Sequence, residues 1–351
     1  MGSKHKNNKP NHKQLWKWVG RVLIGLVLLV LVIFIWFRLS PWPGAMVIRY
    51  VFEKDGAKTT QALEKHAPTG IEVISDQRYQ SNDNDALLDV YTPETAVAGN
   101  AKLPVVIWTH GGAWLSGDKS NSSAYYKLLA RAGYTVVAPD YSLAPNHSYP
   151  TPVHQLNAVY AYIQQNADRF HADTSKIVLA GDSAGSQLSA QMAALATNPD
   201  YAREVGITPN LKPEQLKGVI LTCGIYKMEG LVHPDPTLPK IVGWGDDVSV
   251  WAYSGTNDFS EPVIRQMSPY YHATGDFPPA FITGGNADPL TDAQSKPLAD
   301  KLEQSGVSVT RLFYEPTHAP ALPHEYQFNL DNVDGQKALG EIIGFLQKYN
   351  R

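Results

Sequence analysis

The chain has 351 residues, of which 43% are hydrophobic and 18% are charged. That composition supplies enough apolar material for one large core, or for a core with a cap, and excludes a disordered or fibrous protein. The single cysteine, Cys223, excludes an internal disulfide, and its apolar surroundings in the sequence predict a small buried core residue.

The first 40 residues differ in composition from the rest of the chain. Six basic residues precede an uncharged apolar run over 22–37, which corresponds to about 24 Å of helix, or to about 35 Å if the helix starts at Leu15. We therefore predict a basic cytoplasmic tail over 1–17 and a transmembrane anchor over 18–38. Tryptophans suited to the two membrane interfaces lie at both ends of this run: Trp16, Trp18, Trp36 and Trp42.

A cleaved signal peptide is the alternative, because it too has a basic start and an apolar centre. No small-x-small cleavage pattern follows Phe37, which favours a retained anchor. The excess of basic residues ahead of the run predicts a cytoplasmic amino terminus and an extracytoplasmic body in a single-pass cell-membrane protein, or a secreted body if cleavage occurs. Beyond Arg38 the body carries about ten net negative charges, which disfavours nucleic acid as a partner.

Residues 39–70 are predicted to form a juxtamembrane helical segment. Val47, Ile48, Val51 and Phe52 recur there at the spacing of one helix face. We expect this segment to pack against the body and to take no part in chemistry.

The main domain is predicted to span 71–351 and to open with an antiparallel hairpin. Two strand-like runs, over 71–79 and 86–91, flank five Ser, Asn and Asp residues that favour a turn. Those Asn and Asp residues lack the spaced loop and downstream bidentate acid of a calcium site, so no metal is expected there.

From Leu103 onward, apolar β-rich runs alternate with helical stretches. This alternation predicts a mostly parallel central sheet with helices on both faces. A long gap over about 226–279, rich in Pro, Gly and aromatic residues, is predicted to be a small cap or lid insertion. The predicted strands cover 105–109, 135–139, 176–180, 218–223, 280–283 and 308–313, and the predicted helices lie near 122–131, 152–169, 184–196, 292–305 and 334–349.

The motif Gly181-Asp182-Ser183-Ala184-Gly185 follows one predicted strand and precedes a predicted helix. This is the context of a G-x-S-x-G nucleophile elbow, in which small neighbours let the backbone turn sharply beneath an exposed serine. Ser183 is therefore the predicted catalytic nucleophile.

Attack by a serine needs backbone N–H donors for the oxyanion that forms. The N–H of Ala184 is one predicted donor, since it directly follows the nucleophile. The others are predicted in the tract His110-Gly111-Gly112-Ala113-Trp114, which directly follows a strand. Gly111, Gly112 and Ala113 are the candidates, and His110 is expected to support this loop.

These motifs, together with Asp140-Tyr141-Ser142-Leu143-Ala144-Pro145, resemble those of the α/β-hydrolase superfamily. Within it, the chain is similar to the hormone-sensitive-lipase-like and BD-FAE-like esterase/lipase group over residues 71–349. It departs from the group at Ala113, where many members carry a third glycine, and at Ser142, where an arginine is usual. The resemblance implies an α/β-hydrolase fold and a serine hydrolase that acts on ester bonds.

The chain order of the superfamily is Ser, then acid, then His. Asp288 lies in the loop after the predicted strand over 280–283 and is the expected acid, while Asp292 is the alternative and is expected to cap the next helix. Two histidines follow this loop. His324 is the expected base because an aromatic residue soon follows it, as in the family, and His318 is the alternative.

The resemblance implies a carboxylesterase or lipase that acts through an acyl-enzyme on a small-molecule or lipid ester, with no cofactor and no metal. A neutral histidine base predicts activity that falls at acidic pH, with an apparent pKa near about 6.5. The aromatic insertion suggests an apolar acyl pocket, or else its own packing. A serine peptidase and a non-catalytic binding module on the same fold are the rival functions, and the oligomeric state is left open.

Overall fold

The computed structural model describes residues 12–232 and 239–350. Most of the predicted basic tail over 1–17, and a short part of the predicted insertion over 226–279, lie outside these residues.

Eight strands form one sheet in the order β1-β2-β4-β3-β5-β6-β7-β8. β2 pairs antiparallel with both β1 and β4, and all the other neighbours pair in parallel. The hairpin and the mostly parallel sheet predicted from the sequence are thus confirmed. The strands are β1 (Ile71–Arg78), β2 (Leu87–Pro93), β3 (Leu103–Thr109), β4 (Thr135–Pro139), β5 (Ala172–Asp182), β6 (Leu216–Thr222), β7 (Ala280–Thr283) and β8 (Val309–Leu312).

Helices cover both faces of this sheet because successive strand residues point to opposite sides. In β3, Val105 and Ile107 belong to one hydrophobic cluster, whereas Val106 and Trp108 belong to the other. The first cluster includes residues of α5 (Thr151–Gln165), α6 (Ala184–Thr197) and α12 (Lys296–Gln304), and the second includes residues of α4 (Ser123–Arg131) and α13 (Val333–Tyr349). Each face of the sheet therefore has its own core.

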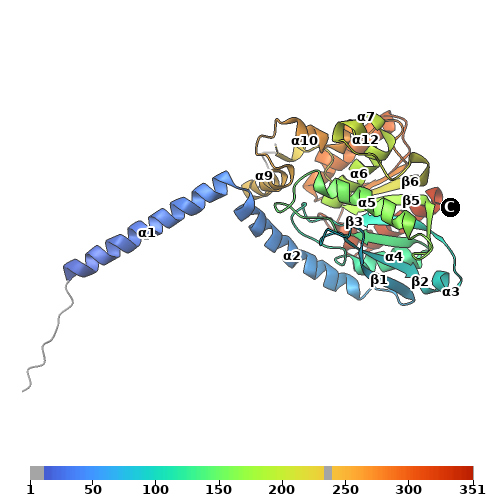
Figure 1. Ribbon diagram of the computed structural model, residues 1–351, viewed down its shortest axis with the longest axis horizontal. Helices are drawn as coiled ribbons and strands as arrows, with labels where there is room; N and C mark the ends of the chain where they lie inside the picture. Colours follow the sequence, from blue (N-terminus) through green and yellow to red (C-terminus); the bar gives the residue numbers. More distant parts are fainter. Residues whose placement is uncertain (1–11, 233–238, 351) are drawn as a thin grey trace, which may run out of the picture.

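The first helix, α1 (His12–Leu39), stands apart from this body (Figure 1). Within Lys13–Leu39, an 18-residue stretch has a mean hydropathy of 2.9, and none of that stretch is buried. By length and composition it could cross a membrane, and a signal sequence would have the same character. Ser40 and Pro41 alone separate α1 from the next helix.

That next helix, α2 (Trp42–Glu64), lies along the body and is fixed at its amino-terminal half. A Cβ atom on Gly44 would lie 2.9 Å from Val248 Cγ1, so the absence of a side chain lets α2 pack closely on α9 (Lys240–Ser254). The guanidinium of Arg49 donates hydrogen bonds to the carbonyl oxygens of Leu115 and, at 2.8 Å, of Ala144. α2 is therefore held both by close packing and by a charged donor.

Between β6 and β7 the described residues form short helices and α9. These are α8 (Glu229–Val232), α10 (Pro262–Gln266) and α11 (Pro269–His272). The two remaining short helices are α3 (Glu94–Ala98) and α7 (Pro199–Val205).

Two local predictions need correction. The helix predicted over 292–305 is divided into a π-helical turn, Thr291–Ser295, and α12. Asp292 does not cap it, since Leu290 and Ser295 occupy the positions before these two elements. The exposed carboxylate of Asp292 instead pairs with Lys296 at 2.6 Å, one helical turn away. Cys223 is buried, as predicted.

Replacing Arg49 with alanine should destabilise the whole chain, because two carbonyl groups lose a charged donor. We expect the Arg49→Ala substitution to lower the free energy of unfolding by about 2–3 kcal/mol. Urea unfolding of the detergent-solubilised protein, followed by tryptophan fluorescence, measures this change. Arg203→Ala is the matched control, because Arg203 is 77% exposed and pairs with Asp200 on the surface of α7; it should cost less than about 1 kcal/mol. Equal losses in the two variants would contradict the role given to Arg49.

Candidate active site

Ser183 lies in a sharp turn between β5 and α6, as the sequence predicts. Its φ of 50° and ψ of −119° are uncommon for a residue with a side chain. The turn fits against β3 because a Cβ atom on Gly185 would overlap the carbonyl oxygen of Thr109. The N–H of Ser183 donates to the carbonyl of Thr222 at 2.9 Å, which ties the turn to β6. The strained conformation is thus imposed by contacts on both sides.

Asp182, the residue before Ser183, connects this turn to the loop after β3. One of its carboxylate oxygens accepts a hydrogen bond from the indole of Trp108 at 2.8 Å, and the other accepts from the N–H of Gly111 at 2.7 Å. Burial raises the pKa of Asp182 to about 7, and the charge of Glu325 acts in the same direction. Asp182 is therefore a structural acceptor, with both oxygens in use.

The backbone N–H groups near Ser183 differ in whether they already have a hydrogen-bond acceptor. The N–H of Gly111 is already bonded to Asp182. Those of Gly112, Ala113 and Ala184 have no hydrogen-bond acceptor within the described part of the chain. Ala113 has a φ of 53°, which lies in the left-handed region that favours glycine. Many members of the group that this chain resembles carry glycine at this position. Three predicted oxyanion donors thus stay available, and Gly111 has another role.

His110 supports this loop, as expected from its position. Its ring stacks on Tyr141 with the ring centres 4.4 Å apart, and its Nδ1–H donates to the carbonyl of Gly111 at 2.8 Å. Burial lowers the pKa of His110, so the ring stays neutral at pH 7. The His110 ring therefore holds the loop in place through its stacking on Tyr141 and its hydrogen bond to Gly111.

The predicted acid and base lie in contact. Nδ1 of His324 is 3.0 Å from a carboxylate oxygen of Asp288, whose side chain is fully buried. The alternative base, His318, instead faces Asp334 at 2.9 Å. The alternative acid, Asp292, is the exposed partner of Lys296 described above. Among the four candidates, only His324 and Asp288 form a pair.

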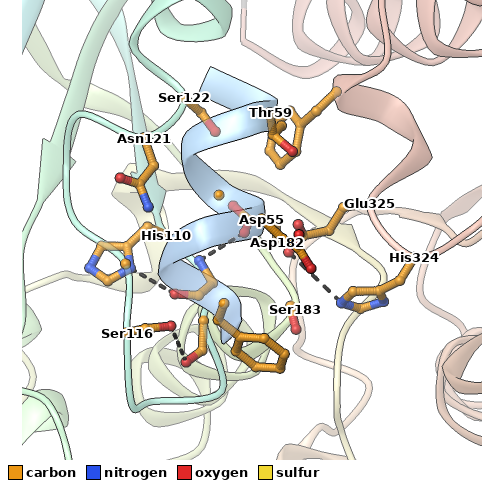
Figure 2. A pocket seen from close by; sticks show the side chains of 16 residues that line it. Asp55, Thr59, His110, Ser116, Asn121, Ser122, Asp182, Ser183, His324 and Glu325 are labelled. Carbon is orange, nitrogen blue, oxygen red and sulfur yellow. Dashed lines mark hydrogen bonds and ion pairs between the residues drawn. The ribbon is translucent and has the colours of Figure 1, made fainter. Parts of the chain in front are cut away.

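Ser183 and His324 line one cavity of about 310 Å³, and Figure 2 shows both side chains. No hydrogen bond joins Ser183 to His324 among the described residues, and such contacts commonly tighten only when a substrate is bound. The cavity walls come from α2, the loop after β3 and the loop that carries His324. The lining residues from α2 are Phe52, Asp55, Gly56 and Thr59.

The residues that line this cavity differ from two expectations drawn from the sequence. α2 was expected only to pack, yet it forms one wall of the cavity beside Ser183 (Figure 2). The aromatic residues of the insertion were one expected source of an apolar pocket. Within the described chain, however, none of the lining residues lies between 226 and 279, and Tyr253 of α9 instead stacks on Trp114 with ring centres 4.8 Å apart. The described aromatic residues of the insertion therefore do not line this cavity, and Tyr253 packs against the loop after β3.

Acidic groups surround His324 and change its proton affinity. Burial disfavours its charged form, but the hydrogen bond and charge of Asp288, together with the charges of Glu325 and Asp182, outweigh burial and raise the pKa of His324 to about 9. Asp246 of α9 also interacts with His324, and burial raises the pKa of Asp246 to about 7. We therefore expect activity to rise at a higher pH than the ordinary histidine pKa of about 6.5, because the sequence alone does not reveal these neighbours.

Cys223, Asp288 and His324 place potential metal-ligand atoms within 4.8 Å of one another. Burial, with the nearby charge of Asp288, raises the pKa of the Cys223 thiol. The neutral thiol lies 3.4 Å from Gln327 Oε1, to which it donates, and a thiol of this kind is a poor metal ligand. Because His324 Nδ1 and Asp288 already bond to each other, the cluster is better suited to proton transfer than to metal binding.

Comparison with known proteins places this geometry in a family context. The BD-FAE family profile matches residues 88–302, which is more than half of the chain. Carboxylesterase NlhH of Mycobacterium tuberculosis is 29% identical over 309 residues, covering 84% of this chain and 90% of NlhH. Esterase LipC of the same organism is 29% identical over 218 residues, covering 61% of this chain and 52% of LipC, so the match spans about half of that relative.

Among solved structures, esterase B from Lactobacillus rhamnosis is similar, with a TM-score of 0.71 and 20% identity over 87% of this chain and 96% of that chain. This likeness shows the fold, which is the predicted α/β-hydrolase fold. The sheet and its covering helices thus belong to a known architecture.

Replacing Glu325 with glutamine should move the pH profile of any reaction that needs neutral His324. Glu325 Oε1 lies 3.8 Å from His324 Nε2, and even at the dielectric constant of water such a charge contributes about 1 kcal/mol. Because a carboxylate raises the pKa of His324, its removal lowers that pKa. Activity rises with pH as His324 loses its proton, so this rise should move to a pH about one unit lower. The pH profile of kcat/KM measures the shift.

Glu214→Gln is the control for this measurement. Glu214 is exposed and precedes β6, so it lies at the opposite end of the strands from Ser183, which follows β5. An unmoved profile in Glu325→Gln, or an equal shift in Glu214→Gln, would show that Glu325 does not set the proton affinity of His324.

Proposed function

The chain belongs to the BD-FAE family, and from that premise we propose that it is a membrane-anchored carboxylesterase with Ser183, His324 and Asp288 as its catalytic triad. One observation carries the proposal. His324, which is paired with buried Asp288, lines the same cavity as the strained Ser183 and Gly112. The N–H groups of Gly112, Ala113 and Ala184 have no acceptor among the described residues. Nucleophile, base, orienting acid and oxyanion donors are thereby within one small volume.

The mechanism follows from these positions. His324 takes the proton of Ser183 as the serine oxygen attacks the ester carbonyl, while buried Asp288 holds the imidazole through Nδ1 and stabilises its charged form. The N–H groups of Gly112, Ala113 and Ala184 donate to the oxyanion. His324 then protonates the departing alcohol, and water, activated by the same residue, releases the acid from Ser183. Asp182 takes part only by holding the two loops together.

The substrate class is inferred from the cavity and the relatives. About 310 Å³ is at the small end of ligand pockets, which suits a short or medium ester. The relatives named above are described as a carboxylesterase and an esterase. Small-molecule and lipid esters are therefore both proposed as substrates of this chain, with no cofactor and no metal in the reaction.

The membrane anchor is proposed to be α1. Its segment Lys13–Leu39 is about 40 Å long as a helix, which exceeds the roughly 30 Å of a bilayer core. The basic residues at its start favour a cytoplasmic amino terminus, so that the catalytic body lies outside the membrane. A protein that is secreted after cleavage of α1 is the alternative.

Hydrolysis of p-nitrophenyl esters of increasing acyl length tests the proposed function. The full chain in detergent should hydrolyse short esters fastest, and Ser183→Ala should reduce turnover by at least about a thousandfold, because it removes the nucleophile. Ser175→Ala, at an exposed position before the buried part of β5, should retain full activity.

Two other outcomes would overturn this assignment. Faster cleavage of matched peptide amides than of esters would favour a serine peptidase. A folded protein that turns over neither substrate class would favour a non-catalytic binding module.

A further inference from the structure

The outward side of α2 is apolar near the anchor and basic beyond it. Val47, Tyr50 and Val51 share one helix face and are 48%, 66% and 46% exposed. The same face continues with the exposed residues Lys54 and Lys58. Exposed aromatic and aliphatic residues followed by lysines are typical of a helix that lies in a membrane interface.

A second element extends this surface. At the start of α9, which packs on α2 through Gly44, Ile241 is 68% exposed and Val242 is 36% exposed. We call the five residues Val47, Tyr50, Val51, Ile241 and Val242 the apolar face. α1 meets the body beside α2 and α9, so that this face lies at the end of the molecule from which the anchor leaves (Figure 1).

The short connection between α1 and α2 decides what covers the apolar face. Only Ser40 and Pro41 lie between these helices, so at most about 10 Å of extended chain separates Leu39 from Trp42. The interfacial region on each side of a bilayer is about 5–8 Å thick. With the apolar run over 22–37 in the membrane, the start of α2 lies within that region or directly beside it, so the apolar face closely follows the span.

The same helix connects the apolar face to the cavity. Phe52 directly follows Val51, is 42% exposed, and lines the cavity with Ser183. Asp55 and Thr59, on the next turns of α2, also lie at the cavity (Figure 2). The mouth of the cavity is therefore bordered by the helix that carries the apolar face.

We propose that the apolar face inserts into the surface of the membrane that holds α1, and that the cavity receives amphiphilic esters from that bilayer. The substrate class is thus an acyl ester resident in the membrane, with its ester bond at the level of the headgroups. This inference rests on the proposed esterase function for its substrate, but the docking of the face does not depend on catalysis.

Lipid quenching measures the docking. The full chain is reconstituted in vesicles of phosphatidylcholine and phosphatidylglycerol, and Val51→Cys carries an environment-sensitive fluorophore; native Cys223 is buried and should stay unlabelled. Lipids with a spin label near the headgroup should quench the probe at position 51 strongly. Ala98→Cys, at an exposed position of α3 far from α1, is the control and should show little quenching. Equal quenching at the two positions overturns the proposal.

Rates measure the consequence for the substrate. The triple variant Tyr50→Ser, Val51→Ser, Ile241→Ser leaves the cavity lining intact. It should hydrolyse a medium-chain diacylglycerol in the same vesicles at least about tenfold more slowly, since interfacial binding scales with buried apolar area. Hydrolysis of water-soluble p-nitrophenyl acetate should stay within about twofold of the wild-type rate, because that ester does not come from the bilayer.

The control variant is Val333→Ser, which changes an apolar side chain that is 72% exposed at the start of α13. It should hydrolyse both esters at the wild-type rates. Equal rates on diacylglycerol for the triple variant and the wild type, or equal losses on both esters, overturn membrane delivery. If the wild type hydrolyses neither ester, the esterase proposal fails, and quenching at position 51 still decides whether the face docks.

Discussion

The buried carboxylate of Asp182 sets the relation between the two loops on which the site depends. It accepts from Trp108 in β3 and from the N–H of Gly111 in the loop that follows, while its own backbone leads into Ser183. A buried carboxylate with two donors is costly to disturb, since either donor would lose its partner. The distance between the serine turn and the proposed oxyanion donors is therefore fixed by the fold before any substrate arrives.

Around this fixed centre, the cavity is completed by segments that are distant in the sequence. α2 supplies one wall, and the loop carrying His324 and Glu325 supplies another. The carboxylates of Asp288, Glu325 and Asp182 raise the proton affinity of His324, so that pH governs how much neutral base is present. α2 also joins the body to α1, so one helix both borders the cavity and leads to the proposed membrane anchor.

Much of the site follows from the sequence because its residues occupy fixed places relative to strands. The strand before Gly181 and the helix after Ser183 were both predictable, and the pairing of His324 with Asp288 follows the chain order of the superfamily. The role of α2 was not predictable, because amphipathic spacing shows that a face is buried but not what it covers. The bond from Gly111 to Asp182 was also hidden, since a glycine-rich tract does not reveal which N–H groups are already satisfied.

The central claim is that Ser183 is the reactive nucleophile of a membrane-anchored esterase. Treating the full chain in phospholipid vesicles with an alkyl fluorophosphonate, and then locating the adduct by peptide mass spectrometry, tests this claim most directly. The account predicts a single phosphonylated residue, Ser183, with labelling that is lost in His324→Ala. An adduct on another residue, or a folded protein that remains unlabelled, would contradict it.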